Sequence, residues 1–258
     1  MGGAERSARK RKQAARAVTQ ARKSGGDRTK VIAGIAVVAV LAVAVIGYVI
    51  YQQQSGDSTT DGAIPAAPAE KVISAPSVRD NNVVVVGKDS ATTTIDVYED
   101  FLCPACGQFE EIYGKDLKTA VEDGKLKIRY NILPMLDRLS KPAGYSSLSA
   151  NAGLCAADAG KFNEFHAALY SKQPEEGGPG YTKDQLIKLG KDLGITDPAF
   201  ETCVQNDTYK APLTDLMSKT SANDALKNNG GFGTPTVAHN GSRVDMAAND
   251  NWLADLLK

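Results

Sequence analysis

Histidine and cysteine are both scarce in this sequence of 258 residues, and their distribution limits the chemistry that it can carry. The two histidines, His166 and His239, lie far apart, and only two of the four cysteines, Cys103 and Cys106, are close together. A structural zinc site usually draws its ligands from two such close pairs. A zinc site built from all four cysteines is therefore the weaker alternative, and we expect no bound metal and no cofactor.

Net charge is also lacking, because 30 basic residues balance 30 acidic ones. The balance conceals two unlike parts. Residues 1–30 carry ten Lys and Arg against two acids, which leaves 20 basic and 28 acidic residues in the rest of the chain. A basic arm can bind nucleic acid, but its position directly before an apolar run favours membrane topology and contact with anionic lipid. We therefore expect no nucleic-acid partner.

Residues 31–51 form a run of 21 residues without a charged side chain. At ~1.5 Å per residue, a helix of this length covers about 30 Å, which is the thickness of a bilayer core. A core helix this long would normally show a polar face, and the apolar part of a cleavable signal peptide is usually only ~7–15 residues long. The sequence predicts an uncleaved, single-pass membrane anchor. The positive-inside rule then places residues 1–30 in the cytoplasm and the rest of the chain outside, where disulfides persist.

The part of the chain after this run changes character at about residue 83. Residues 52–82 are rich in Gln, Ser, Thr, Ala and Pro, which predicts a flexible linker with a reach of roughly 30 Å. Beyond it, strand-like and helix-like segments alternate, which is typical of an α/β domain. Val83–Val86 and residues 92–99 read as strands, and residues 126–133 as a third strand.

The motif Cys103-Pro-Ala-Cys106 stands between the strand expected at residues 92–99 and a helix expected to run from the first cysteine to Gly124. A helix N-terminus stabilises a thiolate, so we expect Cys103 to be an accessible sulfur with a lowered pKa that attacks disulfides. Cys106, one turn further on, would resolve the mixed disulfide. With the strand at residues 126–133, the segment forms a right-handed βαβ unit with parallel strands.

The stretch Tyr98-Glu-Asp-Phe-Leu-Cys-Pro-Ala-Cys-Gly resembles the active-site segment of the DsbA-like branch of the thioredoxin superfamily. Gly233-Thr-Pro-Thr-Val, followed by the Asn240-Gly241 turn and a strand at residues 242–246, resembles the cis-proline loop and last two strands of that superfamily. The resemblance implies that Pro235, preceded by Thr234, is cis and lies beside the CxxC, where it shapes the groove for the substrate backbone.

The resemblance also implies the domain organisation. A thioredoxin-like domain would comprise residues 83–140 and 231–258, with a helical domain inserted at residues 141–230. Within the insert, the sequence predicts helices at residues 142–159 and from Phe162 onward, a third opened by a capping box at Thr182 and Gln185, and a fourth opened by Asp197 and a proline. A final helix is expected at residues 250–257.

The remaining cysteines, Cys155 and Cys203, both lie in apolar surroundings within this insert. We interpret them as a structural disulfide between two helices. A disulfide that closes a loop of nearly fifty residues stabilises a fold by roughly 4 kcal/mol in the chain-entropy model.

One expected acidic group is missing from its usual place. Thioredoxin-like proteins often keep a buried carboxylate six residues before the first cysteine, and here that position holds Val97. Strand alternation puts Glu99 on the same face, so Glu99 is the candidate proton carrier, with a solvated strand-end acid as the alternative. His166 is expected to be a packed core residue and His239 to be exposed.

These features together indicate a membrane-tethered, extracytoplasmic oxidoreductase that donates the Cys103–Cys106 disulfide to unfolded exported proteins. Resemblance to anchored DsbA-like proteins of Gram-positive and actinobacterial envelopes implies reoxidation by a quinone-linked membrane oxidase of the DsbB or vitamin K epoxide reductase type. Thr234 before the proline is also compatible with a reductase or isomerase, which is the second possibility. A non-catalytic envelope module with two structural disulfides is the third possibility.

Overall fold

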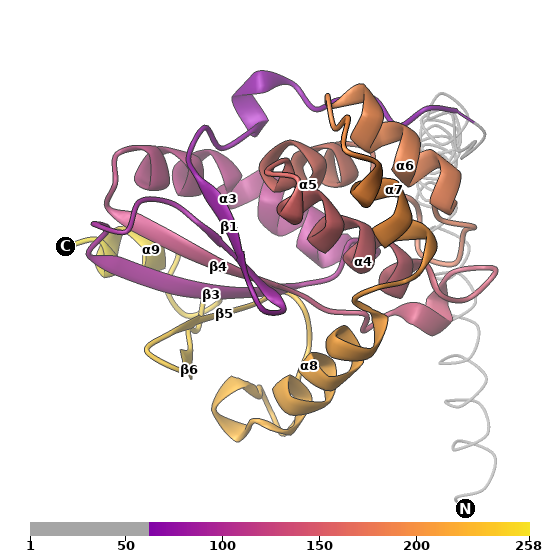
Figure 1. Cartoon of the computed structure of the whole chain (residues 1–258). Coiled ribbons are helices and arrows are strands. Elements are labelled where there is room, and N and C mark those ends of the chain that lie inside the picture. The colour runs from indigo at the N-terminus through magenta and orange to yellow at the C-terminus, as the bar shows by residue number, and fades with distance from the viewer. Residues whose placement is uncertain (1–61) are drawn as a thin grey trace, which may run out of the picture. The chain divides into compact units, whose positions relative to one another are not determined.

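A single mixed sheet organises the structure, a computed structural model that describes residues 62–258. Its six strands have the order β1-β2-β4-β3-β5-β6 (Figure 1). Strands β3 and β4 are parallel, and every other neighbouring pair is antiparallel. The strand bounds are β1 (Ser77–Asp80), β2 (Val83–Val86), β3 (Thr93–Glu99), β4 (Leu126–Ile132), β5 (Thr236–His239) and β6 (Ser242–Arg243).

The predicted βαβ unit is confirmed, with helix α3 (Pro104–Glu122) connecting β3 to its parallel neighbour β4. Burial alternates along β3, so that Val97 and Glu99 share the fully buried face while Asp96 lies on the other. This arrangement sets the CxxC at the carboxyl end of a central strand. Ligand and active sites of open α/β sheets are usually found at that edge.

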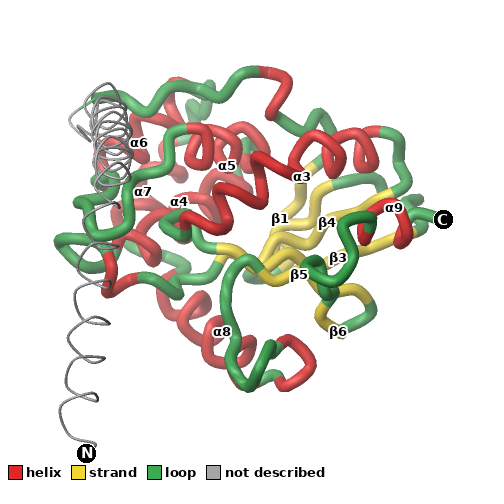
Figure 2. The backbone as a smooth tube through the Cα atoms, turned by 180° about the vertical axis from the view of Figure 1, so that it is seen from behind, coloured by secondary structure: helices red, strands yellow, loops and turns green. Residues whose placement is uncertain are grey.

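The inserted segment is helical, as expected, and begins after a short 3-10 turn, η2 (Asp137–Leu139). The capping box at Thr182 and Gln185 is present, and Asp197 caps the following helix by accepting the Ala199 N–H. Figure 1 and Figure 2 show α3 to α7 gathered above the sheet and α8, which the sequence did not predict, below it. The helices are α4 (Tyr145–Asp158), α5 (Phe162–Ser171), α6 (Lys183–Asp192), α7 (Pro198–Gln205) and α8 (Lys210–Ala222).

One hydrophobic core joins the insert to the sheet. It extends from Val97 and Leu117 of the βαβ unit to Phe165 and Leu186 in the insert. Small residues make this possible, because the Ala, Ser and Gly residues of α4 allow close packing, and twelve of its fourteen residues are buried. The inserted helices therefore belong to the same compact unit as the thioredoxin-like part.

The chain ends in a hairpin and a short helix that packs on α3. Asn240 and Gly241 connect β5 to β6 with φ values of 50° and 78°, as a tight two-residue hairpin turn requires. β6 is shorter than the strand expected at residues 242–246. A short 3-10 segment, η3 (Asp224–Leu226), lies between α8 and β5. The final helix, α9 (Trp252–Leu256), places the centre of the Trp252 ring 5.5 Å from that of the Tyr113 ring.

The prediction of a flexible linker is wrong for residues 62–82. Ile64 is only 2% exposed, and β1 and the 3-10 turn η1 (Ala69–Lys71) both fall in this stretch. The Asn163 side chain donates to the carbonyl oxygens of Ile73 and Ala75, 2.8 Å from each. The prediction from composition failed because a few apolar residues between the prolines are enough to pack this stretch against the domain. The rest of the expected linker, residues 52–61, lies outside the described residues.

No helix within residues 62–258 combines the length and apolar character that a membrane crossing needs. The anchor expected at residues 31–51 and the basic arm at residues 1–30 both lie outside the described residues. Both therefore stay predictions.

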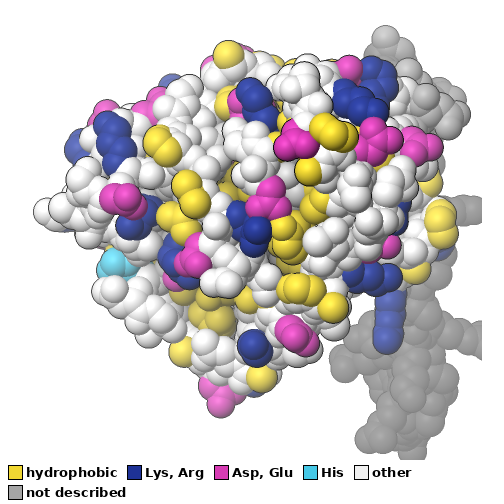
Figure 3. All heavy atoms as spheres, viewed as in Figure 1, with side chains coloured by type: hydrophobic (Ala, Val, Ile, Leu, Met, Phe, Trp, Pro, Cys, Tyr) yellow, Lys and Arg dark blue, Asp and Glu magenta, His cyan; other side chains and the backbone are white. Residues whose placement is uncertain are grey.

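Charges of both signs are interspersed on the face of the described domain that Figure 3 shows. Several are paired, including Arg79 with Asp158 and Lys188 with Asp192. A nucleic-acid-binding surface would instead gather Lys and Arg on one face, and the face in Figure 3 carries no such cluster among the described residues.

Cys155 of α4 and Cys203 of α7 form a disulfide that closes a loop of 48 residues. Replacing both by alanine is expected to lower the free energy of unfolding by about 4 kcal/mol, because the unfolded chain regains the freedom of that loop. Chemical denaturation of the double variant against the wild type would measure the loss. The exchange activity of the folded variant should stay intact, and a loss of activity without a loss of stability would contradict a purely structural role.

Candidate active site

The two cysteines of the CxxC occupy the first turn of α3 in different environments. Cys103 is the N-cap, and Pro104 at the first helical position needs no N–H partner. The Cys103 carbonyl accepts the backbone N–H groups of Cys106 and Gly107 at 3.0 and 3.2 Å. Both cysteines are free thiols in this structure. The two sulfurs therefore lie at the start of one helix, where the positive end of the helix dipole stabilises a thiolate.

Cys103 is less accessible than the sequence analysis predicted. The whole residue is 6% exposed, because the buried residues Phe101 and Leu102 precede it and the Thr234 carbonyl lies 3.3 Å from its sulfur. Pro104 and Ala105 are exposed. These two residues therefore form exposed surface directly next to Cys103.

The Cys103 thiol has a pKa lowered to about 6. The largest cause is a hydrogen bond from the Cys106 thiol, followed by one from the Thr234 side chain and by the backbone N–H groups of Cys106 and Ala105. These donors outweigh burial, which alone would raise the pKa. In its protonated form, the thiol donates to the Thr234 carbonyl. The site thus favours the thiolate of Cys103 at neutral pH.

Cys106 has the opposite character. It is wholly buried, and burial is the first reason that its pKa is raised well above the usual value for a thiol. Its hydrogen bond to Cys103 and the charges of Cys103 and Glu99 raise the pKa further. Cys106 therefore holds its proton while Cys103 is a thiolate, and must release that proton before it can act as a nucleophile.

The loop before β5 completes the site. The Thr234–Pro235 peptide bond is cis, as the resemblance implied, and the Thr234 carbonyl faces Cys103. A second cis bond, Lys141–Pro142, stands before α4 and was not anticipated. Strand β5 pairs with β3, which explains how residues 131 positions apart in the sequence meet at one sulfur.

Glu99 is buried beneath the CxxC, which excludes the alternative of a solvated acid. It is 0% exposed, and one of its oxygens lies 2.5 Å from Nε2 of His166, while the other has no hydrogen-bond partner. His166 is packed and hydrogen-bonded, in agreement with the sequence interpretation. His239 is half-buried rather than exposed, because its Nδ1 lies 2.9 Å from the Thr94 carbonyl.

Two residues that sequence reasoning missed hold the loop around Cys103. Asp100 is fully buried and accepts the backbone N–H groups of Leu102 and Leu136 at 2.8 Å, while burial raises its pKa to about 6. Gln173 donates to the carbonyl oxygens of Phe101 and Cys103 at 3.1 and 2.8 Å. An acid directly before the apolar Phe-Leu pair was a usable signal for Asp100. Nothing in the sequence connects Gln173 to the motif.

Metal-ligating side chains converge at one place within residues 62–258. The disulfide between Cys155 and Cys203 removes two of the four thiols, so a four-cysteine zinc site is excluded. Glu99, Glu110 and His166 bring ligand-type atoms within 4.8 Å of one another. The 2.5 Å contact between His166 and Glu99 is a hydrogen bond, so Nε2 of His166 already has a partner and is not free to bind a metal ion.

Comparisons with known proteins agree with this geometry. The family model described as Thioredoxin matches residues 79–258. DsbA from Mycobacterium tuberculosis, in its reduced crystal form, is 29% identical with a TM-score of 0.54, over 64% of this chain and 85% of that one. The disulfide bond oxidoreductase DsbG from the same organism is 30% identical with a TM-score of 0.53, over 62% and 79% of the two chains.

A curated relative extends the similarity to a larger protein. The serine/threonine-protein kinase PknE of M. tuberculosis is 34% identical over 184 residues, which is 69% of this chain but 32% of the kinase. The chain thus spans about a third of the length of that relative. Since the family model covers most of the chain, the chain belongs to the thioredoxin family, and the two aligned structures to which it is similar are disulfide oxidoreductases.

Proposed function

We propose that this protein is a membrane-tethered, extracytoplasmic thiol oxidase that donates its Cys103–Cys106 disulfide to exported proteins. The single observation that carries the proposal is the position of Cys103 at the N-cap of α3 and against the cis Thr234–Pro235 bond, where the pKa of its thiol is lowered. A stabilised thiolate stabilises the reduced form of the pair, and a thiol of low pKa is also a good leaving group. Both effects favour release of the disulfide to a client.

The proposed reaction has two exchange steps. A client thiolate attacks Cys103, the Cys103–Cys106 bond breaks, and Cys106 leaves as a thiolate that takes up a proton. A second client thiolate then attacks the client sulfur of the mixed disulfide and releases Cys103 as a thiolate. The client has lost two electrons and the CxxC has gained them. Glu99, buried beside Cys106, is the proposed proton donor in the first step.

The cis-proline loop is proposed to orient the client. Thr234 and Pro235 stand against Cys103, and the edge formed by Pro104 and Ala105 is exposed. An extended client backbone that follows the loop would bring its sulfur to the exposed side of Cys103, while Cys106 stays covered. Attack at Cys103 rather than Cys106 follows from this difference in access.

The cellular setting is part of the proposal. The uncharged run at residues 31–51, preceded by ten basic residues, supports a single-pass anchor with the catalytic domain outside the cytoplasm. Each turnover leaves Cys103 and Cys106 reduced, so a reoxidant is needed. A quinone-linked membrane oxidase of the DsbB or vitamin K epoxide reductase type would supply it. The interspersed charges on the face in Figure 3 give no support to a nucleic-acid partner.

The reduction potential of the CxxC pair tests the direction of electron flow. The proposal expects a potential closer to the value of about −120 mV for DsbA than to that of thioredoxin, when the protein is equilibrated with glutathione buffers. A value near −270 mV, as in thioredoxin, would contradict an oxidase and support the reductase or isomerase. The disulfide between Cys155 and Cys203 should stay closed throughout the titration.

A further inference from the structure

Cys106 must exchange a proton in every catalytic cycle, yet it has no exposed surface through which to do so. It is 0% exposed, and Cys103 above it is itself almost covered. The CxxC surface is moreover the place where a client would sit. A proton that enters or leaves during the reaction therefore needs a second path through the domain.

The first turns of α3 and the last turns of α5 offer such a path. Cys106 and Glu110 are four residues apart and lie on the same face of α3, and His166 and Tyr170 have the same spacing on α5. Glu99 ends the strand below them. The imidazole of His166 is 2.5 Å from Glu99, and the ligand-type atoms of Glu99, Glu110 and His166 all lie within 4.8 Å of one another.

Several polar atoms along this path are buried without a partner. They are Glu99 Oε2, Glu110 Oε1 and the Tyr170 hydroxyl. Buried polar groups are nearly always hydrogen-bonded, so three unpartnered atoms in one small region call for an explanation. Groups that pass a proton from one to the next are a natural one, because each must be free to donate in one state and accept in another.

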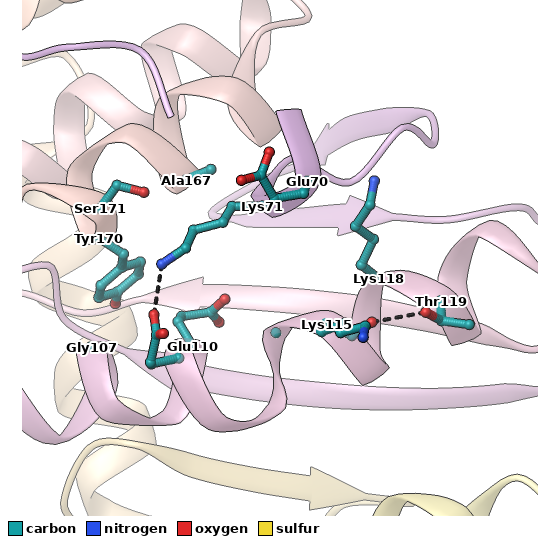
Figure 4. Close-up of a pocket in the computed structure, with 12 residues that line it drawn as sticks. Glu70, Lys71, Gly107, Glu110, Lys115, Lys118, Thr119, Ala167, Tyr170 and Ser171 are labelled. Carbon is teal, nitrogen blue, oxygen red and sulfur yellow. Dashed lines mark hydrogen bonds and ion pairs between the residues drawn. The ribbon is translucent and has the colours of Figure 1, made fainter. Parts of the chain in front are cut away.

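The path opens to the surface at Glu110. This side chain and Tyr170 line a cavity of about 550 Å³ between α3 and α5, which is also bordered by Lys71 of η1 (Figure 4). Glu110 also shares a second, smaller hollow with His166. None of the residues that line this cavity comes from the cis-proline loop. Water in it can therefore exchange protons while a client occupies Cys103.

We propose that Glu99, His166 and Glu110 form a lateral proton relay that connects the Cys106 thiol to this cavity. The inference rests on the proposed function, because only an active CxxC requires the proton. When Cys106 attacks a mixed disulfide, its proton passes to Glu99, from Glu99 to His166, from His166 to Glu110, and from Glu110 to water in the cavity. The reverse sequence protonates the Cys106 thiolate when a client opens the disulfide.

The charges around the relay suit proton exchange near neutral pH. Burial raises the pKa of Glu110 to about 7, with Glu99 raising it and His166 and Lys71 lowering it. Burial alone would lower the pKa of His166, but Glu99 and Glu110 outweigh it and raise the pKa. Cys106 and the phenols of Tyr130 and Tyr170 are the other titratable groups that face these acids.

The test separates the two steps of oxidation of the reduced full-length chain by glutathione disulfide. Cys103 first forms a mixed disulfide with glutathione, and Cys106 then resolves it with release of a glutathione thiol. Acid quenching and mass spectrometry resolve both steps. Glu110→Gln and His166→Gln should slow the second step at least about tenfold at pH 7, since acid–base assistance is typically worth more than that. The first step should be unchanged.

The neighbouring Glu111 supplies the matched control. It lies next to Glu110 on α3, pairs with Lys71, and is 71% exposed. Glu111→Gln should behave as the wild type in both steps. In the pH profile of the second-step rate, the wild type and Glu111→Gln should both show an ionisation centred near pH 7. Glu110→Gln should lack this ionisation. Formate should restore the second step in Glu110→Ala, because the cavity admits a small acid.

The outcomes are distinguishable. Equal second-step rates and pH profiles in Glu110→Gln, Glu111→Gln and the wild type would overturn the relay. A slow second step in Glu110→Gln, with no rescue of Glu110→Ala by formate, would overturn the relay in favour of a structural role for Glu110. A change of the wild-type second-step rate on addition of a chelator would overturn the relay in favour of a metal bound by the same three residues. A wild type that forms no mixed disulfide would instead refute the proposed function.

Discussion

A Cys106→Ala variant is expected to accumulate client proteins covalently bound through Cys103. Without the second thiol, the mixed disulfide has no intramolecular escape and persists until another thiol attacks it. Non-reducing electrophoresis of the full-length variant, followed by peptide mapping, would show client peptides joined to Cys103. Multiple-turnover disulfide transfer by this variant should be lost completely.

Cys103→Ala is the matched control for that experiment. It retains Cys106, but this sulfur is wholly buried and keeps its proton. No client adducts are therefore expected, and both variants should keep the far-ultraviolet circular dichroism spectrum of the reduced wild type. Adducts on Cys106 in the Cys103→Ala variant would contradict the assigned order of attack. No adducts in either variant would favour a non-catalytic module with two structural disulfides.

The second large effect is expected in the ionisation of Cys103. A pKa of about 6 would leave about 90% of this thiol ionised at pH 7, whereas a thiol with the usual value of about 8.5 would be only a few per cent ionised. Thiolate absorbance in the ultraviolet and the rate of alkylation by iodoacetamide, both followed against pH, should give midpoints near pH 6. A single midpoint above pH 8 would contradict the description of the site.

The same shift makes the stability of the reduced protein depend on pH. The pKa of Cys103 is lower in the folded state than in the unfolded chain, so its contribution is full above the ordinary thiol pKa and is lost as pH falls through about 6. The reduced wild type should thus gain stability relative to Cys103→Ala between pH 6 and about 8.5. Cys106 has a raised pKa and opposes this trend only at higher pH.

The sequence predicted the local geometry of the site well and its distant contributors poorly. Hydrophobic alternation correctly placed Glu99 on the buried face of β3, and the motif placed Cys103 at a helix N-terminus. Both predictions depend only on the spacing of residues within one strand or one helix. Gln173 holds the Cys103 carbonyl from 70 residues away, and no local pattern encodes such a contact. The accessible sulfur expected at Cys103 was wrong for the same reason, because the distant Thr234 covers it.

The fold shows the same division. The strand at Val83–Val86, the parallel β3–β4 pair and the capping box at Thr182 follow from short-range rules and are confirmed. The order of residues 62–82 is not encoded locally, because it depends on tertiary contacts such as those of Asn163 with the backbone of this stretch. Pro- and Ala-rich composition resembles that of a linker when those partners are not known.

A single-turnover thiol count tests the central claim most directly. Oxidised protein is mixed with an equimolar reduced dithiol peptide, and every cysteine is then alkylated and mapped by mass spectrometry. Loss of two peptide thiols, matched by two new thiols at Cys103 and Cys106 with Cys155 and Cys203 still joined, is the result that we predict. New thiols at Cys155 and Cys203, or a peptide that keeps both of its thiols, would contradict it.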